Sequence, residues 1–396
     1  MRRNRSAHSP AIRDARPGLL VRLGWMTALA AGALQALAVS PADGKTWRSE
    51  KHSFTVTTVA AGLEHPWSLA FLPGGDMLVT EREGRLRLIR NGKLLPEPVK
   101  GGPKSVVRGQ GGLLEVALHP QFAENRLVYL SYAAQGAGGV GTEVARGRFD
   151  GDTLTDIEVI FSVDLKTPGS AHYGGRLAFA PDGTLFITLG DRYSYMKEAQ
   201  NPANHLGALI RVRDDGTVPP DNPFVGKPGI KPEIYSYGHR NMQGIAFHPE
   251  TGALWTHEHG PRGGDEVNII KPGANYGWPA ITYGIDYSGA IISDKTEAPG
   301  MEQPVIHWTP SIAPSGMAFY NGDKFPGWRG SLFVGALAGT HLRRLTLEGE
   351  TVVAQEVLLA DLRQRIRDVR QGPDGFLYIV TDDAYDGRVM RIEPAS

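Results

Sequence analysis

Six copies of one short pattern constrain the fold of this chain more than any other feature of its sequence. Each copy has a short apolar segment, a turn rich in Pro, Gly or Asp, and a second apolar segment. In the third copy, Leu177–Phe179 and Leu185–Leu189 flank a Pro-Asp-Gly turn. Two apolar segments around such a turn are typical of a β-hairpin. The other five copies begin at Pro66, Gly111, Gln243, Ser315 and Arg367.

The spacing of these copies predicts the architecture. They recur at intervals of roughly 45 to 75 residues, which is enough for four strands with their loops. We therefore expect an all-β protein whose residues 54–396 form a six-bladed β-propeller with four-stranded antiparallel blades. The 50 Gly and 28 Pro residues also favour short strands joined by turns. A pair of β-sandwiches is the alternative fold, but sandwiches do not require such a regular unit.

The N-terminal region is typical of an export signal. Several arginines precede the apolar run Leu23–Val39, which contains the small-residue sequence Ala36-Leu37-Ala38 near its end. This order of basic, apolar and small residues predicts a signal peptide over residues 1–38, followed by an N-terminal extension over 39–53. We expect a periplasmic, soluble protein with no membrane insertion after cleavage. An uncleaved anchor is the alternative, although the apolar run is short for a membrane span.

Charge and cysteine content exclude several classes of function. The chain has 42 Lys and Arg residues and 42 Asp and Glu residues. Such a balance gives no overall positive field, so we expect no nucleic-acid partner. The chain contains no cysteine, which excludes disulfide bonds, Cys-ligated metals and a thiol nucleophile.

Unusual polar residues lie just outside the six hairpins, where the strand ends of a propeller converge on its central channel. Taken singly, each has a structural explanation: His172 could be a surface residue or a hydrogen-bonded structural residue, Asp191 could cap a turn, and Arg365 and Arg367 could pair with Asp residues of a neighbouring blade. Their combination at the same end of the blades indicates a site instead. The set comprises Gln110, His172, Asp191, Arg240, Asn241, Gly260, Pro261, Trp308, Arg365 and Arg367.

Seven motifs in a fixed order resemble those of a known family. They are "GQGGLLEVALHP", "HYGGRLAF", "YGHRNMQGIAF", "EHGPRGGDEVN", "NYGWP", "WTPSIAPSG" and "RIRDVRQGPDGFLYIVTDD", all lying between about Val56 and Ile392. The chain thus resembles the aldose dehydrogenases that carry pyrroloquinoline quinone (PQQ), the glucose/sorbosone dehydrogenase family. The resemblance implies a six-bladed propeller with PQQ in the channel mouth and calcium (Ca²⁺) beneath it. It also implies oxidation of an aldose at its anomeric carbon to the lactone, with an external electron acceptor.

The resemblance also implies roles for individual residues. His172 matches the general base that takes the proton of the anomeric hydroxyl, Asp191 matches its acidic partner, and Arg240 matches a cation beside the quinone oxygen. Arg365 and Arg367 match a clamp for the cofactor carboxylates. The two glycines that follow "HY" would let the backbone approach the flat cofactor closely. Further cofactor contacts fall on Gln110, Asn241, Trp308 and Ser311.

Two calcium sites follow from the same resemblance. The carbonyl oxygens of Gly260 and Pro261 match the ligands of the ion beneath the cofactor, and carbonyl oxygen is a hard donor that suits calcium. A second, structural site matches Glu266, the carbonyl of Tyr276, and Asp286.

One position departs from the family pattern, and other functions remain open. Ala338 stands where some members have a lysine that contacts the cofactor, and Arg343 and Arg344 are the nearest basic residues. A metal-dependent lactonase and a non-catalytic binding propeller are the rival functions. A metal-dependent hydrolase requires a cluster of carboxylates to hold its metal ion. The candidate residues at the channel are mostly cationic, which favours an anionic cofactor instead. The sequence leaves the preferred aldose open, and it allows either a monomer or a homodimer.

Overall fold

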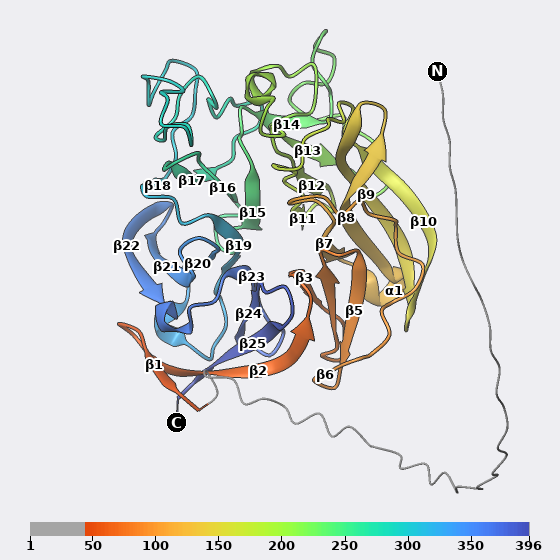
Figure 1. Ribbon diagram of the computed structural model, residues 1–396, viewed down its shortest axis with the longest axis vertical. Coiled ribbons are helices and arrows are strands. Elements are labelled where there is room, and N and C mark those ends of the chain that lie inside the picture. The colour runs from red at the N-terminus through yellow and green to blue at the C-terminus, as the bar shows by residue number, and fades with distance from the viewer. Residues whose placement is uncertain (1–43, 396) are drawn as a thin grey trace, which may run out of the picture. The chain divides into compact units, whose positions relative to one another are not determined.

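The computed structural model describes residues 44–395. The expected signal peptide lies outside these residues, as does the first part of the expected extension. The described chain forms six antiparallel sheets that follow one another in sequence and surround a central axis (Figure 1). The prediction of a six-bladed β-propeller is therefore confirmed.

In the first five blades, the strands run from the channel outward in chain order. Their bounds are β3 (Pro66–Phe71), β4 (Met77–Glu81), β5 (Arg85–Arg90) and β6 (Lys93–Leu94) in blade 1; β7 (Leu113–Leu118), β8 (Leu127–Gly136), β9 (Gly139–Asp150) and β10 (Thr153–Ser162) in blade 2; β11 (Leu177–Phe179), β12 (Leu185–Thr188), β13 (Ala208–Val212) and β14 (Ile234–Tyr237) in blade 3; β15 (Met242–Phe247), β16 (Leu254–Glu258), β17 (Asp265–Ile269) and β18 (Ile306–Trp308) in blade 4; and β19 (Pro314–Phe319), β20 (Leu332–Ala336), β21 (His341–Glu348) and β22 (Thr351–Leu358) in blade 5.

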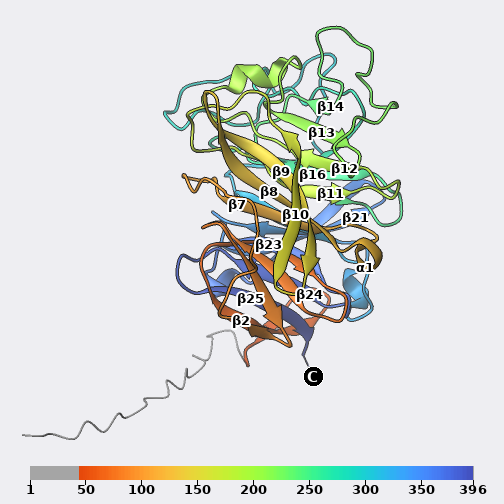
Figure 2. The same ribbon diagram turned by 90° about the vertical axis from the view of Figure 1, so that its right-hand side faces the viewer.

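The sixth blade closes the ring with strands from both ends of the described chain. Its order is β23 (Ile366–Gln371), β24 (Leu377–Thr381), β25 (Gly387–Pro394), β2 (Ser53–Leu63) and β1 (Thr46–Arg48). The antiparallel pairing of β2 with β25 brings the two ends of the propeller side by side, as Figures 1 and 2 both show. Strand β1 lies within the segment expected as an extension and adds a fifth strand to this blade.

Helices are few and short. The structure has one α-helical turn, α1 (Phe122–Asn125), and three 3₁₀ turns, at Met196–Gln200, Pro326–Trp328 and Ala360–Leu362. None of the helices within residues 44–395 has the length and apolar character needed to cross a membrane.

The six sequence repeats form the two innermost strands of each blade, and their turn chemistry explains the hairpins. In blade 3, Gly183 donates its N–H to the carbonyl of Ala180 (2.9 Å) at a φ of +83°, a conformation that favours glycine. The carboxylate of Asp182 accepts the N–H of Thr184 (2.9 Å) and fixes the other side of the turn. The hairpin begins and ends close to the residues predicted from the sequence.

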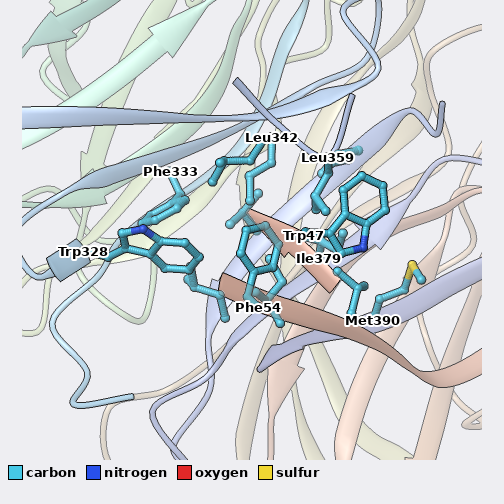
Figure 3. Close-up of a cluster of buried hydrophobic side chains, with 14 of the residues drawn as sticks. Trp47, Phe54, Trp328, Phe333, Leu342, Leu359, Ile379 and Met390 are labelled. Atoms are coloured by element: carbon cyan, nitrogen blue, oxygen red, sulfur yellow. The ribbon is translucent and has the colours of Figure 1, made fainter. Parts of the chain in front are cut away.

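Hydrophobic clusters between neighbouring blades hold the ring together. The cluster in Figure 3 joins blades 5 and 6, where Trp328 and Phe333 pack against Phe54 of the closing strand. Trp47 of β1 lies in the same cluster and is 8% exposed. Closure of the ring therefore buries aromatic side chains from the N-terminal strands, which stabilises the sixth blade by removing apolar area from water.

Candidate active site

A cavity of about 280 Å³ lies at the end of the channel where the innermost strands begin. All six blades contribute to its wall, because each innermost strand or its approach places a residue there. One representative per blade is Trp67, Leu114, Gly174, Gln243, Ala313 and Arg367. Residues far apart in the sequence thus meet in one place.

A cluster of four charged side chains, three of them buried and the fourth half-buried, lies next to this cavity. Arg176 donates to the carboxylates of Glu115 (3.0 Å) and Asp368 (2.8 Å). Arg370 contacts the same two carboxylates. Two cations therefore balance two anions. The remaining Arg176 hydrogen bonds reach the carbonyls of Gln243 and Arg367, which line the cavity. The cluster thereby ties the cavity wall to the channel interior.

His172 and Asp191 form a close pair beside the cavity. His172 precedes β11 and Asp191 follows β12, so the hairpin of blade 3 brings them together. The Nδ1 atom of His172 lies 2.6 Å from Oδ1 of Asp191, and both residues are buried. Gln110 accepts the backbone N–H of His172 at 2.8 Å and itself lines the cavity. The alternative that His172 is a surface residue is wrong, because the residue is only 4% exposed.

The partners of Asp191 fix the tautomer of His172. Its Oδ1 also accepts the N–H of Tyr193 (2.7 Å), and its Oδ2 accepts the indole N–H of Trp278 (2.8 Å). Both of these groups can only donate, so the carboxylate accepts on both oxygens and the proton of the imidazole lies on Nδ1. Among the described residues, no group bonds the Nε2 atom of His172. This nitrogen therefore keeps a lone pair that can accept a proton.

The surroundings of His172 favour the neutral form of its imidazole. Burial lowers its pKa below the ordinary value, the hydrogen bond to Asp191 opposes this shift, and the positive charges of Arg240 and Arg192 add to it. A neutral imidazole is the form that acts as a base. The backbone is also strained here, since His172, Arg192 and Tyr193 have φ values of 53°, 59° and 64°. Such conformations in residues other than glycine cluster at functional sites.

Arg240 and Asn241 lie just before β15 and present unpaired polar atoms. The Nη1 atom of Arg240 donates to the carbonyls of His259 (3.0 Å) and Gly260 (2.7 Å), and the guanidinium lies 5.2 Å from the ring centroid of Trp278. The Asn241 carbonyl oxygen accepts the N–H of Gly174 at 3.1 Å. The Nε of Arg240 and the Nδ2 of Asn241 are buried without a partner. Buried unpaired donors are uncommon, and a ligand bound beside these two would give them acceptors.

Arg365 and Arg367 both line the cavity and share one carboxylate. Arg367 donates to Asp382 at 2.9 Å, and Arg365 donates to the same oxygen at 3.3 Å through two nitrogens. Burial opposes ionisation of Asp382, but Arg367 and His65 outweigh it and hold the pKa of this carboxyl below its usual range. Both arginines therefore do pair with an aspartate, as the structural alternative holds, but it lies in their own blade and not in a neighbouring one. The Nε of Arg367 stays buried and unpaired, so this arginine retains donors for an anionic ligand.

The loop after β16 carries the two carbonyls expected to bind calcium. Gly260 O accepts from Arg240, and Pro261 O accepts the hydroxyl of Ser311 at 3.2 Å. Asp265 holds the loop by accepting the N–H of Gly260 at 2.8 Å. Burial raises the pKa of Asp265 to about 6, against the opposing effect of its backbone N–H donors. Each carbonyl oxygen has two lone pairs and uses one, so each can still serve as a ligand.

The residues expected at the second calcium site are not joined by direct contacts. Glu266 lies across the sheet from Glu258, and burial together with the charge of Glu258 raises its pKa. Tyr276 stacks on His239, which bonds to Glu258. Asp286 is half-buried, and its carboxylate accepts the N–H and the hydroxyl of Ser288 within its own turn. Within residues 44–395, no group of three or more His, Asp or Glu side chains is arranged to hold a metal ion.

Trp308 is placed apart from the cavity lining. It lies on β18, the outermost strand of blade 4, and packs in a cluster with Trp255 and Val267. Its indole N–H donates to Gln355 at 3.0 Å. Ser311 bonds to Gly263 and Pro261 and so supports the loop after β16.

The glycines after Tyr173 serve packing. A Cβ atom on Gly174, which lines the cavity, would lie 2.5 Å from the carbonyl oxygen of Thr188. A Cβ atom on Gly175 would lie 2.6 Å from the side chain of Leu114 in blade 2. Both glycines also have positive φ values, of 63° and 98°. Close contact between strands therefore requires these glycines whether or not a ligand is bound.

Comparisons with known proteins identify the family. A sequence model described as "Glucose / Sorbosone dehydrogenase" matches residues 63–391. The chain belongs to this family. It is 47% identical to aldose sugar dehydrogenase YliI of Escherichia coli (strain K12) over 338 residues, which cover 84% of this chain and 91% of that protein.

Solved structures agree with this assignment. A crystal structure of a glucose dehydrogenase is 52% identical, has a TM-score of 0.84, and is matched over 86% of this chain and 100% of that chain. The PQQ-bound form of an aldose sugar dehydrogenase from Streptomyces coelicolor is 31% identical, has a TM-score of 0.70, and is matched over 86% and 98% of the two chains. The resemblance to the dehydrogenase family seen in the sequence motifs is confirmed.

Two charged residues of the cavity wall were not predicted from the sequence. Arg82 and Asp382 line the cavity, and each directly follows the second strand of its blade. Arg343 and Arg344, the nearest basic residues to Ala338, do not line the cavity: Arg343 bonds to Gln355 at 2.7 Å and Arg344 pairs with Glu356. Arg82 and Asp382 could have been found from their position, because both follow the second strand of a blade, as Asp191 does.

Proposed function

We propose that this protein is a quinoprotein that oxidises the anomeric carbon of aldose sugars to the lactone, with PQQ as cofactor and His172 as general base. The observation that carries the proposal is the His172–Asp191 pair, whose free Nε2 lies beside a cavity with an arginine-rich wall. The PQQ-bound relative and the aldose sugar dehydrogenase relative support both the cofactor and the substrate class.

The residues present suit a polyanionic cofactor. The Arg and Asp side chains of the cavity wall are three arginines and one aspartate: Arg82, Arg365, Arg367 and Asp382. The buried, unpaired donors on Arg240, Asn241 and Arg367 would gain acceptors from bound carboxylate and quinone oxygens. Arg367 would hold a carboxylate with its Nε, which is free while its Nη2 bonds to Asp382. Gln110 would contact the same ligand from blade 2.

The carbonyls of Gly260 and Pro261 would bind calcium beneath the cofactor, with oxygens of the cofactor completing its shell. Hard carbonyl donors fit this ion, and each has one lone pair available. The second calcium site, at Glu266, Tyr276 and Asp286, stays a prediction that requires Asp286 to leave its own turn.

PQQ, when bound, supplies an acceptor for the hydride of the anomeric C–H bond. The protein has to remove the proton of the anomeric hydroxyl, and the Nε2 of His172 is the atom that accepts it. Asp191 then stabilises the imidazolium through the Nδ1–H bond and keeps the ring oriented. Arg240 is fixed by two backbone carbonyls, so its charge can stabilise negative charge that develops beside it without reorganisation.

The cellular setting follows from the N-terminal pattern. We propose export to the periplasm with cleavage near Val39, and transfer of the electrons to an external acceptor. N-terminal sequencing of protein from a periplasmic fraction tests this part. An intact Met1 recovered from a membrane fraction would favour an anchor.

Reconstitution tests the activity. Purified apoprotein is incubated with PQQ and calcium, and reduction of a dye by glucose is followed. We expect turnover that requires the cofactor and is lost when calcium is omitted. In His172→Gln, turnover should fall roughly 10²–10⁴-fold while the cofactor absorbance shows full loading. Turnover near that of the parent in a fully loaded variant would refute the role of His172.

A further inference from the structure

Two exposed aromatic side chains lie beside the proposed base. Tyr193 is 48% exposed and Tyr287 is 58% exposed. Their rings stack on each other with centroids 6.5 Å apart and an angle of 21° between their planes. Large apolar side chains that remain exposed as a group, rather than singly, mark binding surfaces.

The pair is attached to the catalytic groups on both sides. The Tyr193 ring lies edge-on to the His172 ring at 5.2 Å, and the Tyr193 N–H bonds to Asp191. The Tyr287 ring lies 5.9 Å from the guanidinium of Arg240 and lines the cavity. A contiguous aromatic surface therefore extends from the proposed base to solvent at the cavity mouth.

The chemistry of this surface fits a ring sugar. A pyranose has faces of C–H bonds and an edge of hydroxyls, and tyrosine has an apolar ring with a polar tip. No group of the described chain bonds the hydroxyl of Tyr193 or Tyr287, so both can bond sugar hydroxyls. Tyr193 has a φ of 64°, and its N–H bonds the same Asp191 oxygen that His172 contacts, so the position of its backbone is coupled to that of the base.

We infer that Tyr193 and Tyr287 form an aromatic platform that binds the pyranose ring of the aldose and directs its anomeric hydroxyl to Nε2 of His172. This inference rests on the proposed function for its substrate, but the platform itself is a binding surface that can be measured without catalysis. Its loss should weaken sugar binding and leave the cofactor in place.

Tyr287→Ala is the decisive variant, with Tyr287→Phe retaining the ring. Removing one aromatic contact should raise KM for a pyranose aldose roughly 2- to 13-fold, with kcat changed less than about twofold. Tyr287→Phe should raise KM less than Tyr287→Ala does, because it keeps the ring and loses only the hydroxyl. Tyr385→Ala removes an exposed tyrosine from the loop between β24 and β25 and should leave KM unchanged. A cofactor titration of each variant should give the affinity of the parent.

A substrate analogue separates this inference from the proposed function. An anhydroalditol that lacks the anomeric hydroxyl cannot be oxidised, and its binding to the loaded protein is measured by calorimetry. We expect Tyr287→Ala to weaken it by the same factor as KM. If the parent oxidises no aldose but binds the analogue in a Tyr287-dependent way, the proposed function fails and the platform stands. If the parent oxidises aldoses while Tyr287→Ala leaves KM and analogue affinity unchanged, or lowers only cofactor affinity, the platform is wrong.

Discussion

Replacing Asp191 by asparagine tests the central pair of the site. Three donors converge on this carboxylate: the Nδ1 of His172, the backbone N–H of Tyr193 and the indole N–H of Trp278. An asparagine side chain has one accepting oxygen and one donating nitrogen. In either orientation its nitrogen faces at least one of these donors, because Oδ1 and Oδ2 are both occupied by groups that donate.

The magnitude follows from this geometry. Asp191 is fully buried, so a donor left without an acceptor costs about 1–3 kcal/mol in the free energy of unfolding. The loss of the negative charge also destabilises the imidazolium that His172 must become. We expect kcat to fall roughly 10- to 100-fold at its plateau, less than in His172→Gln because the base is still present.

The pH dependence gives a signature that a purely structural role would not produce. The base acts when neutral, so the rate falls as pH drops through the pKa of His172, which burial already places below its ordinary value. Asp191 raises that pKa in the parent. Its neutralisation should therefore move the acid limb of the pH–rate profile to lower pH.

Asp265→Asn is the matched control. This carboxylate is also fully buried and accepts three backbone N–H groups, from Gly260, Ile312 and Ala313, but it has no bond to His172. It should cost similar stability in urea unfolding without moving the acid limb. If Asp191→Asn kept the parental plateau and acid limb, or if both variants moved the limb equally, the assignment of Asp191 would be refuted.

Three further outcomes are expected. Arg367→Ala should weaken PQQ binding roughly 10- to 150-fold in a titration, because it removes a charge-assisted contact, whereas Arg343→Ala, outside the cavity lining, should bind as the parent does. Gly175→Ala should destabilise the fold by about 1–3 kcal/mol in urea unfolding, because its Cβ would meet Leu114 at 2.6 Å; parental stability would contradict this packing. Burial lowers the pKa of His257 to about 3, so stability should be full above pH 6.5 and fall toward pH 3 by up to about 1.4 kcal/mol per pH unit, a slope that His257→Gln should reduce.

The hairpins could be predicted because their signal is local. Apolar alternation and turn residues such as Pro181-Asp182-Gly183 decide each hairpin within about a dozen residues, and six copies decide the architecture. The closing strand was not predicted in the same way. Strand β2 pairs with β25, more than three hundred residues later in the chain, and no turn between them marks that pairing.

Strand register and loop paths explain why the sequence could not place Trp308 and did not single out Tyr193 and Tyr287. The indole of Trp308 packs between blades because β18 pairs with β17 in a register that opposes Trp308 to Asp265. A shift of one residue in that register would turn the side chain to the other face, and a motif does not reveal the register. Tyr193 and Tyr287 lie on loops, whose paths depend on contacts across blades.

Three blades repeat the pairing of an acid with a basic residue of the same blade, and only one of these three pairs can act as a base. The acid at the end of the second strand bonds a basic residue before or within the first strand in three blades: Asp191 with His172, Glu258 with His239, and Asp382 with Arg367. The pairing is therefore a property of the blade fold and does not by itself indicate catalysis.

His239 resembles His172 in its carboxylate bond, but its Nε2 is bonded to the hydroxyl of Ser236 at 2.9 Å and the residue is fully buried. Arginine keeps its proton at any physiological pH. Of the three basic residues, only His172 combines a carboxylate partner with a nitrogen free to take a proton. Removing the Ser236 hydroxyl should therefore not allow His239 to rescue His172→Gln, because the His239 ring is fully buried. Restored turnover in that double variant would show that the pairing, rather than access to the cavity, decides which blade is catalytic.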